Sequence, residues 1–410
     1  MLSLHTSPLA LLGRTRDAGG MNVYVRELSR ELGRGSMYVD IFTRRSDPSL
    51  PPIQHVSERT RLIHIPAGPA IPFPPSELYP YVDDFARRVA RFAERSEHGY
   101  DMLHSHYWLS GAAGLTLSRE WDVPHVTMFH TVERLKSQQY GGASDSRQSA
   151  IRAEQEGRIA AGVDCITVST EQEGEQLSKL YGLPASRMHV IPCGVDLEAF
   201  TPGTPGERRA ARAALGSDRA PTLLFVGRLD PIKGIDLLLE SVAAMHVPAR
   251  LIVVGGNPDG DPEVERLRAV AADLGLAGRV TFPGAVAQRD LPRYYRGADA
   301  LVVTSRYESF GLAAVEALAC GTPVVAAQVG GLPSIVCEGE NGLLLRWRCP
   351  DAFAEQLDML LEDDALRARL AARARPSVER FGWEHIGDEV RGVYQELTTA
   401  ARARVACSCF

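Results

Sequence analysis

Hydrophobic residues recur along this chain with two spacings, and the two alternate. Short apolar runs bounded by turn residues predict strands, whereas apolar residues three or four positions apart predict amphipathic helices. In the first half, the helical spacing is clearest at 17–35 and 81–96. Strands are expected in the same half at 1–5, 39–45, 100–107, 124–131, 163–170 and 188–196. Strands alternating with helices indicate a parallel, doubly wound sheet.

A second series of the same kind begins after 200–210, a segment rich in Pro, Gly and charge that is typical of a linker. Six apolar runs follow, enough for a complete Rossmann-like domain: 221–230, 249–256, 278–284, 298–305, 322–331 and 341–346. We therefore predict an α/β protein of two Rossmann-like, doubly wound parallel-sheet domains that face a central cleft. The expected bounds are 1–197 and 198–378, with a helical segment at 379–410 that packs back on the N-terminal domain.

Composition favours an ordinary enzyme. The length of 410 residues exceeds what one hydrophobic core usually supports, and 45% apolar with 23% charged residues is typical of soluble proteins. The net charge of −6, without a basic tract, argues against nucleic acid or anionic lipid as a partner. The 7 cysteines are scattered, which indicates reduced thiols, and no apolar run approaches the ~18 residues of a membrane span. We expect a cytoplasmic enzyme without a signal peptide or membrane span.

The first motif with chemistry is FVGRLDPIKGID, residues 225–236. An apolar strand ends at Gly227, and Arg228 and Lys233 occupy the turn before the next helix. Cations beside the free N–H groups of a helix N-terminus favour an anion such as a diphosphate. Lys233 stands out because only three of the 45 basic residues are lysine. The alternative is an ordinary solvated turn.

The second motif is RYESFGLAAVEALACG, residues 306–321, which places Glu308 and Glu316 eight positions apart in an apolar segment. Glu308 falls in the loop after a predicted strand, and a helix opens at 309–312. Glu316 lies two turns inside, where it can accept hydrogen bonds from vicinal hydroxyls such as those of a ribose. The alternative makes Glu308 a helix cap and Glu316 a surface residue, but it does not account for the basic loop some 80 residues earlier.

The C-terminal half resembles the retaining glycosyltransferases of family 4, which have the GT-B fold. The resemblance rests on GRLDPIKG, on YYRGADALVVTSRYESFGLAAVEALACGTPVVA with its E-x7-E pair, and on VGGLPSIV. It implies a nucleotide-sugar donor, expected to be UDP-glucose or UDP-N-acetylglucosamine. Arg228 and Lys233 would hold the diphosphate, Glu316 the ribose, and Glu308 the hydroxyls of the transferred sugar. The backbone groups implied to bind phosphate and hexose are those of Phe310, Gly311 and Leu312.

The N-terminal half resembles a subgroup of that family, the inositol-phosphate glycosyltransferases and, more distantly, the sucrose-phosphate synthases. The motifs are HTSPLALLGRTRDAGGMNVYVREL, LHSHYWLSG and FHT. Gly20 opens the first helix, where a glycine lets the donor or the acceptor approach the backbone closely. The subgroup implies that Asn22 binds the inositol and that His130 lies near the donor sugar. The residues implied to bind the acceptor phosphate are Tyr107, Thr131 and Arg152. The expected catalytic set is His130, Arg228, Lys233 and Glu308.

One position departs from the subgroup. Where those enzymes place a lysine on the acceptor phosphate, this chain has Pro75, and its loop before Asp17 is one residue longer. A missing charge-assisted contact would cost ~1.5–3 kcal/mol of binding, unless Arg14 or Arg16 compensates. The expected acceptor is therefore a small phosphorylated or polyol molecule, such as inositol phosphate or fructose 6-phosphate.

Two other groups suggest a metal and are given less weight. His104 and His106 lie at a predicted strand end, but no carboxylate motif accompanies them. Asp259 and Asp261 in PDGDP mimic the D-x-D metal motif of the other glycosyltransferase fold, within a Gly/Pro/Asp loop. The resemblance to GT-B enzymes implies no cofactor and no essential metal, because basic side chains and helix N-termini stabilise the leaving diphosphate.

Other functions stay open. One is a nucleotide-sugar epimerase, hydrolase or non-catalytic binder of similar build, and another is a transferase for a lipid-linked or polysaccharide acceptor. The mechanism implied by the resemblance is front-face attack, in which the departing phosphate helps to deprotonate the acceptor. A homodimer is one expected assembly. The first strand is short for this pattern, which suggests an internal start at Met1 or a trimmed strand.

Overall fold

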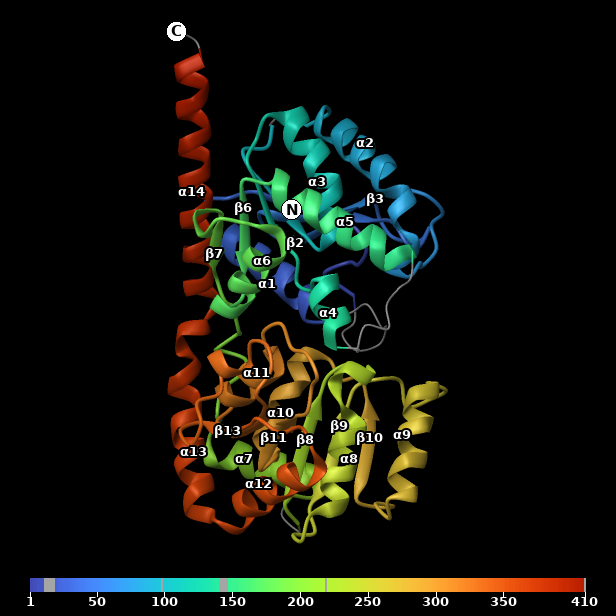
Figure 1. Ribbon diagram of the computed structural model, residues 1–410, viewed down its shortest axis with the longest axis vertical. Helices are drawn as coiled ribbons and strands as arrows, with labels where there is room; N and C mark the ends of the chain where they lie inside the picture. Colours follow the sequence, from blue (N-terminus) through green and yellow to red (C-terminus); the bar gives the residue numbers. More distant parts are fainter. Residues whose placement is uncertain (11–18, 97–98, 140–146, 218–219, 409–410) are drawn as a thin grey trace. The chain divides into compact units, whose positions relative to one another are not determined.

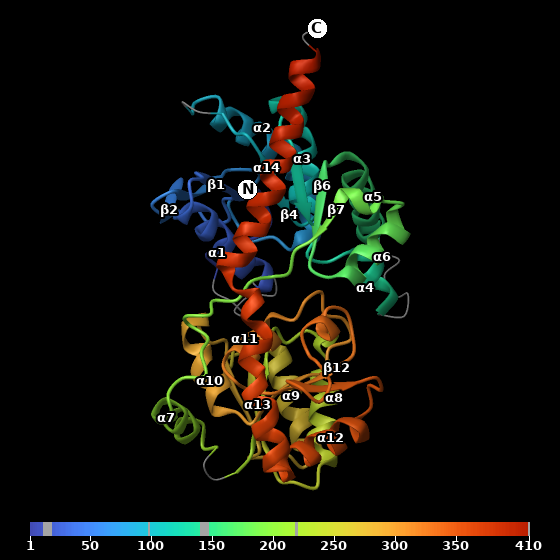
Figure 2. The ribbon, with the colours of Figure 1, turned by 90° about the vertical axis from the view of Figure 1, so that its left-hand side faces the viewer.

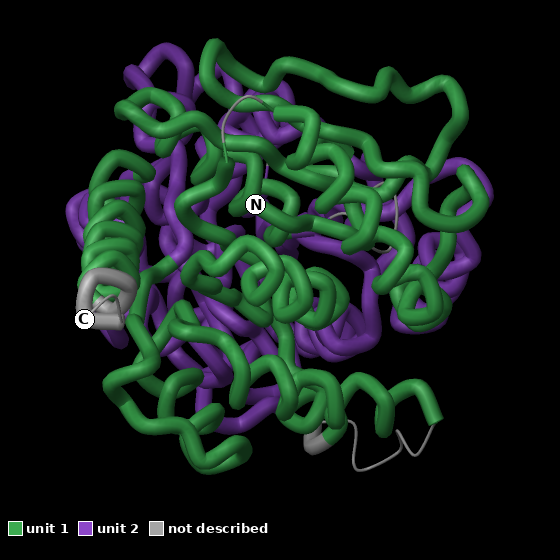
Figure 3. Tube along the Cα trace, turned by 90° about the horizontal axis from the view of Figure 1, so that it is seen from above, with its two compact units in different colours: residues 1–10, 20–192, 383–410 green, residues 11–19, 193–382 purple. Residues whose placement is uncertain are grey.

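The computed structural model of the chain describes residues 1–10, 19–96, 99–139, 147–217 and 220–408. They form an α/β protein that divides into two compact units, coloured separately in Figure 3 (Figures 1 and 3). Among the described residues, unit 1 consists of 1–10, 20–192 and 383–408, and unit 2 of Gly19 and 193–382. None of the described helices is long and apolar enough to cross a membrane.

Unit 1 is built on two ladders of strands, ordered β1-β3-β2 and β4-β5-β6-β7. Its strands are β1 (Val39–Arg44), β2 (Ile53–Ser57), β3 (Thr60–Ile65), β4 (Leu103–His106), β5 (His125–Met128), β6 (Cys165–Val168) and β7 (Met188–Val190). Its helices are α1 (Gly20–Arg34), α2 (Val82–Ala93), α3 (Trp108–Trp121), α4 (Glu133–Gln139), α5 (Arg147–Gly162), α6 (Glu171–Tyr181) and α14 (Trp383–Ser408).

Residues 1–4 join the two ladders. Leu2 bridges to Phe42 of β1 on one side and to Ser105 of β4 on the other. The N–H of Leu2 donates to the His104 carbonyl at 2.8 Å, and the N–H of Ser3 donates to the Phe42 carbonyl at 2.9 Å. The strand predicted at 1–5 is thus reduced to a bridge, but it occupies the point where strand order reverses between β1 and β4.

One strand of unit 1, β2, departs from the parallel pattern of the other strands. This strand pairs antiparallel with β3 through a tight connection, and most of its residues are exposed. An exposed edge strand lacks the continuous apolar run of a buried parallel strand, so the sequence carries little signal for it.

The described residues of unit 2 form one sheet, ordered β10-β9-β8-β11-β12-β13, in which every pair is parallel. The six strands predicted from the second apolar series are confirmed as β8 (Thr222–Val226), β9 (Arg250–Val254), β10 (Val280–Gly284), β11 (Ala300–Val303), β12 (Val324–Ala327) and β13 (Gly342–Leu345). The helices are α7 (Pro205–Leu215), α8 (Ile235–Ala244), α9 (Pro262–Asp273), α10 (Leu291–Gly297), α11 (Leu312–Ala319), α12 (Pro350–Glu362) and α13 (Asp364–Val378).

Alternate residues of the unit 2 strands form one large core with α8, α9 and α12. Leu223 and Phe225 of β8 belong to it together with Leu238 of α8 and Phe353 of α12. Because side chains alternate between the faces of a strand, the intervening residues face the other side of the sheet, and Leu224 is also fully buried. Burial on both faces explains why these strands read as continuous apolar runs.

The C-terminal helix α14 belongs to unit 1 and packs against α1, as Figure 2 shows. Its apolar residues Ile386 and Val390 are buried. Farther along, the Tyr394 hydroxyl lies 2.6 Å from Nδ1 of His104 in β4. The helix therefore covers the sheet at the centre of unit 1.

Candidate active site

The carboxyl edge of the unit 2 sheet holds both sequence motifs. Strand order reverses between β8 and β11, because β9 and β10 lie beyond β8 whereas β12 and β13 lie beyond β11. In open α/β sheets, ligands bind outside the carboxyl ends of the strands at such a reversal. Lys233 follows β8 and Glu308 follows β11, so the fold brings the two motifs to this point.

Lys233 and Glu308 form an ion pair. The Lys233 Nζ donates to Oε2 of Glu308 at 2.6 Å, and the Ser305 hydroxyl donates to the same oxygen at 3.3 Å. The two side chains are 20% and 17% exposed, so solvent still reaches them. Arg228, from the same loop as Lys233, lies 3.9 Å from the Asp230 carboxylate. An ammonium group next to a carboxylate can serve a phosphate and a hydroxyl group at adjacent positions.

The Lys233 turn packs directly on the end of β11. Gly234 has a φ of +69°, and a Cβ placed on it would lie 2.4 Å from the carbonyl oxygen of Thr304. The Thr304 hydroxyl donates to the Gly234 carbonyl at 2.8 Å. On the other side of the turn, the Ile232 N–H donates to Asp230 at 3.0 Å. A glycine is therefore required at 234, and the turn fixes where the Lys233 side chain starts.

Glu316 lies on α11 and is only 7% exposed, so the alternative of a surface residue is wrong. Its Oε2 accepts from the Tyr295 hydroxyl at 2.7 Å and its Oε1 accepts from the Gln288 amide at 3.2 Å. Burial, together with the Glu316 anion, raises the pKa of Tyr295 well above its usual value, so this hydroxyl remains a donor. The carboxylate is thus held in place by protein donors, and a carboxylate accepts up to about four hydrogen bonds.

The helix N-terminus between the two glutamates depends on three glycines. Gly311, with a φ of +115°, caps α11 before Leu312. A Cβ on Gly330 would lie 1.8 Å from the carbonyl oxygen of Glu308, and the N–H of Gly331 donates to that oxygen at 2.9 Å. The segment after β12 therefore packs backbone to backbone against the loop after β11.

The edge of unit 2 thus carries most of the donor residues predicted from sequence. They are Arg228, Lys233, Glu308, Phe310, Gly311, Leu312 and Glu316. Phe310 is buried, and its ring packs edge to face on Phe381. Gly20, the remaining one, belongs to unit 1 and is the first residue of α1.

In unit 1, Asn22 is fully buried near the start of α1. Its amide donates to the Thr6 hydroxyl at 2.8 Å and to the Ser7 carbonyl at 2.7 Å. Thr6 and Ser7 follow the bridge residues 1–4, so Asn22 lies where the strand order of unit 1 reverses. This is the position at which a ligand of unit 1 is expected.

In the predicted acceptor-phosphate set, Arg152 contacts both Tyr107 and Thr131. Arg152 donates to the Tyr107 hydroxyl at 3.1 Å, to the Thr131 carbonyl at 2.7 Å and to the Thr131 hydroxyl at 3.0 Å. Its Nε donates to Glu156 at 2.7 Å. Tyr107 has a φ of +73°, an uncommon conformation for a residue other than glycine, and such conformations cluster at functional sites.

His130 follows β5 and also has a positive φ, of +60°. Its Nε2 lies 3.1 Å from Nδ1 of His106. Burial lowers the pKa of His130 to about 3, so the imidazole is neutral at pH 7. Among the described residues, no three His, Cys, Asp or Glu side chains come together as a metal site.

Sequence reasoning missed several residues of these two edges. In unit 2 they are Gln288 and Tyr295, and in unit 1 they are His5, Glu133 and Glu156. Glu156 stands four positions after Arg152 on one helix, a spacing that could have predicted the ion pair. The His5 ring lies 4.3 Å from the Tyr107 ring, a contact that only the folded chain creates.

Pro75 begins a short 3₁₀ turn in unit 1, Pro75–Glu77. Its ring carries no charge, so this position offers no cation to a ligand. Arg14, Arg16 and Asp17, which the sequence suggested as compensation or as part of a longer loop, lie outside the described residues.

The D-x-D candidate has a structural explanation. Asp261 caps α9 by accepting from the Glu263 N–H at 3.0 Å. The N–H of Asp259 donates to the Asn257 side chain at 3.3 Å. A capping role accounts for Asp261 without a metal.

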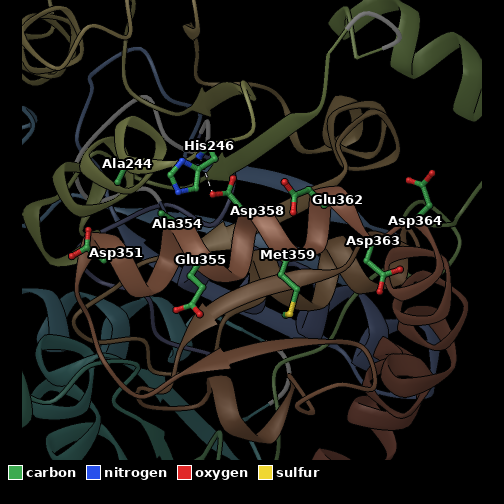
Figure 4. A pocket seen from close by; sticks show the side chains of 10 residues that line it. All are labelled: Ala244, His246, Asp351, Ala354, Glu355, Asp358, Met359, Glu362, Asp363 and Asp364. Carbon is green, nitrogen blue, oxygen red and sulfur yellow. Dashed lines mark hydrogen bonds between the residues drawn. The ribbon is translucent and has the colours of Figure 1, made fainter.

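Unit 2 also has an open groove of about 800 Å³ beside α8 and α12, shown in Figure 4. Its lining is rich in carboxylates, namely Asp351, Glu355, Asp358, Glu362, Asp363 and Asp364. Asp358 accepts from the N–H groups of His246 and Val247 at 2.9 and 3.0 Å. None of the predicted site residues lines this groove, and its negative charge disfavours a diphosphate.

Two Rossmann-like units in one chain, each with polar side chains where strand order reverses, are typical of the GT-B fold. Residues 18–199 match the family model Glycosyltransferase Family 4, and residues 207–376 match Glycosyl transferases group 1. The chain belongs to glycosyltransferase family 4, as the sequence motifs predicted.

Individual relatives are similar over almost the whole chain. The D-inositol 3-phosphate glycosyltransferase of Xylanimonas cellulosilytica is 43% identical to this chain, and the match covers 98% of each of the two sequences. The enzyme of the same name from Acidothermus cellulolyticus is 40% identical over 99% of this chain and 92% of its own length. Among solved structures, sucrose-phosphate synthase from Thermosynechococcus elongatus has a TM-score of 0.88 and 33% identity, covering 97% of this chain and 98% of its own.

Proposed function

We propose that this glycosyltransferase transfers glucose or N-acetylglucosamine from a UDP-sugar to a small polyol or its phosphate, with retention of configuration. The main observation in support of a nucleotide-sugar site is the Lys233–Glu308 ion pair at 2.6 Å. This pair lies at the same edge of the unit 2 sheet as the buried Glu316. Lys233 offers a cation to the diphosphate, Glu308 accepts from sugar hydroxyls, and Glu316 accepts from the ribose. The names of the relatives, D-inositol 3-phosphate glycosyltransferase and sucrose-phosphate synthase, support the acceptor class.

The proposed reaction needs no protein nucleophile. The acceptor hydroxyl attacks the anomeric carbon on the face from which the diphosphate leaves. The bond from that carbon to the phosphate oxygen breaks as the new C–O bond forms, and the hydroxyl proton passes to the departing phosphate. Arg228, Lys233 and the N–H groups that open α11 stabilise the charge on the leaving group. On this proposal the reaction proceeds without a cofactor or a metal.

Unit 1 supplies the acceptor residues on this proposal. Asn22, held by Thr6 and Ser7, and the Tyr107–Thr131–Arg152 cluster would bind the acceptor. His130, neutral at pH 7, would contact the transferred sugar as a hydrogen-bonding group. Gly20 at the start of α1 would face the donor diphosphate. A homodimer stays a prediction.

The test is a panel of UDP-glucose and UDP-N-acetylglucosamine against inositol, inositol 1-phosphate, fructose and fructose 6-phosphate, with UDP release as the readout. Lys233→Ala should lower kcat/KM at least about 100-fold, because it removes a cation from the leaving group. Lys179→Ala is the matched control, since that side chain is 78% exposed on α6. Glu316→Ala should likewise abolish transfer with the fold intact.

Three results would overturn the proposal. Near-normal turnover by Lys233→Ala or Glu316→Ala would show that these residues do not form the donor site. Epimer or rapid free sugar formed without an acceptor would indicate an epimerase or a hydrolase. A loss of activity in EDTA that manganese reverses would indicate a metal-dependent transferase. Asp259 and Asp261 would then be the candidate metal ligands.

A further inference from the structure

His106 and His130 form a pair of imidazole rings beside two neighbouring strands of unit 1. His106 is the last residue of β4 and is fully buried, whereas His130 follows β5 and is partly exposed. The two strands pair in parallel, so their carboxyl ends lie at the same edge. Nδ1 of His106 lies 3.1 Å from Nε2 of His130, which is the distance of a hydrogen bond. The pair therefore includes the side chain that we propose contacts the transferred sugar.

Both rings are neutral at pH 7. Burial lowers the pKa of His130 to about 3, and burial is also the main cause that lowers the pKa of His106 well below its usual value. A neutral imidazole carries one hydrogen, on Nδ1 or on Nε2, and its other nitrogen can only accept. The hydrogen bond between the rings thus has two possible directions, and each direction fixes the tautomer of both rings.

The surroundings of His106 favour one direction. Its Nε2 is buried and has no hydrogen-bond partner within the described part of the chain. If His130 were the donor, this Nε2 would carry a hydrogen that nothing accepts. Buried N–H groups that lack an acceptor are rarer in proteins than acceptors that lack a donor. Donation from Nδ1 of His106 to Nε2 of His130 is therefore favoured, and it places the hydrogen of His130 on Nδ1.

Tyr24 contacts the same two rings from α1. Its fully buried ring packs edge to face on His106 and on His130, with centroids 5.7 and 5.3 Å apart and interplanar angles of 65° and 73°. The backbone of His130 has a φ of +60°, a conformation that persists only where the surrounding structure imposes it. The ring contact and the hydrogen bond thus fix the orientation of the His130 imidazole.

We propose that His106 is a positioning residue that keeps the His130 imidazole in one orientation with its hydrogen on Nδ1. In this state Nε2 of His130 accepts from His106, so the ring has a donor and no nitrogen left to act as a base. His130 can then orient a sugar oxygen but cannot take the proton of the acceptor hydroxyl, which on the proposed mechanism passes to the departing phosphate. The role of His130 rests on the proposed function, whereas its tautomer does not.

Nuclear magnetic resonance tests the tautomer directly. The whole chain is labelled with the heavy nitrogen isotope in its histidine rings, and spectra at neutral pH distinguish ring nitrogens that carry a hydrogen from those that do not. The signals of the two rings are identified by their loss in His106→Asn and in His130→Gln. We expect both rings to carry their hydrogen on Nδ1. A hydrogen on Nε2 of His130 would overturn the inference, whether or not the protein transfers a sugar.

Substitutions at His106 test the positioning role. His106→Leu removes the donor, and kcat should fall about tenfold, as expected for the loss of one hydrogen bond. The Kd of UDP should stay unchanged, because UDP lacks the sugar that His130 is proposed to contact. His106→Asn should restore most of kcat, because the asparagine amide can donate from nearly the place of Nδ1.

His125→Leu is the matched control. His125 is an equally buried histidine of β5, but its Nε2 pairs with the Ser105 hydroxyl at 2.7 Å. The control should leave both kcat and the Kd of UDP near their wild-type values. If His106→Leu does not fold, His106→Asn and the wild-type spectra still decide.

Three kinetic results would overturn the inference and leave the proposed function standing. They are an unchanged kcat in His106→Leu, an equal loss of kcat in His125→Leu, and no recovery in His106→Asn. A wild-type protein that transfers no sugar would instead overturn the proposed function, and the spectra would still test the tautomer.

Discussion

Glu316 shows how a single buried carboxylate can be prepared for a ligand. Its two oxygens accept from Tyr295 and from Gln288, which come from α10 and from the turn before it. A carboxylate that accepts from two fixed donors keeps one orientation, so little order is lost when a ribose binds. The proposed donor affinity therefore depends on residues that do not touch the donor.

Tyr295→Phe tests this dependence. Removing the hydroxyl deletes a hydrogen bond to a buried charged group, which is worth about 1.5–3 kcal/mol. We expect UDP binding measured by titration calorimetry to weaken about tenfold, with only a modest loss of thermal stability. Tyr294→Phe is the control, because the Tyr294 ring packs beside the Arg293 guanidinium at 5.2 Å. An unchanged UDP affinity in Tyr295→Phe would show that the Glu316 orientation does not matter.

At the scale of residues, the sequence predicted the charged side chains at the carboxyl edge of the unit 2 sheet. It did not predict the residues that hold them in place by hydrogen bonds. Lys233, Glu308 and Glu316 belong to compact motifs whose spacing around a strand end has a physical reading. Tyr295 lies at the start of the motif YYRGADALVV and Gln288 lies in the turn before it, but only the folded chain shows that both donate to Glu316.

At the scale of elements, the loop after β11 depends on the loop after β12. The carbonyl oxygen of Glu308 accepts from the Gly331 N–H, and the Cα of Gly330 leaves no room for a side chain against that oxygen. The position of Glu308 is thus set partly by a segment that begins about 20 residues later in the sequence.

Gly330→Ala should therefore harm the site more than a glycine replacement elsewhere. Gly330 and Gly339 both have positive φ, of +52° and +71°, but a Cβ on Gly339 has no neighbour within 4 Å. Strained backbone alone costs about 1–2 kcal/mol at either position. Gly330→Ala should lose about 2 kcal/mol more in urea unfolding, and kcat/KM should fall, because its Cβ would lie 1.8 Å from the Glu308 oxygen. Equal losses in the two variants would contradict this account of the loop.

The elements themselves were predicted unevenly. The unit 2 strands carry apolar residues on both faces, so each one gave an unmistakable run. The segment at 1–5 was recognised, but it forms only a bridge because few residues pair on either side. The hairpin of β2 and β3 was missed, since β2 is an exposed edge strand whose pairing is a tertiary event.

At the scale of the whole molecule, the two units differ in their histidines. Of the 11 histidines, only His246 falls within residues 193–382. In unit 1, burial lowers the pKa to about 3 for His5, His125 and His130, and lowers it well below the usual value for His104 and His106. Unit 1 therefore buries these imidazole rings in their neutral form.

Acid should consequently unfold unit 1 before unit 2. When burial lowers the pKa of a histidine in the folded state, its full contribution to folding stability is present above its unfolded pKa of about 6.5. That contribution is lost as the pH falls from about 6.5 toward 3. At pH 5, each of the three residues with a pKa of about 3 should cost roughly 2 kcal/mol. Glu173, whose pKa burial raises to about 7, acts in the opposite direction and offsets about one of them.

The measurement uses thermal unfolding at pH 7.5 and at pH 5, followed by tryptophan fluorescence and by calorimetry. Trp108, Trp121 and Trp383 belong to unit 1, so fluorescence reports mainly that unit. The fluorescence transition should fall by many degrees between the two pH values, because about 4 kcal/mol is a large part of a domain's stability. The other calorimetric transition should move much less. If both transitions shift equally, or the fluorescence transition is the more acid-resistant, the buried histidines do not control the acid stability of unit 1.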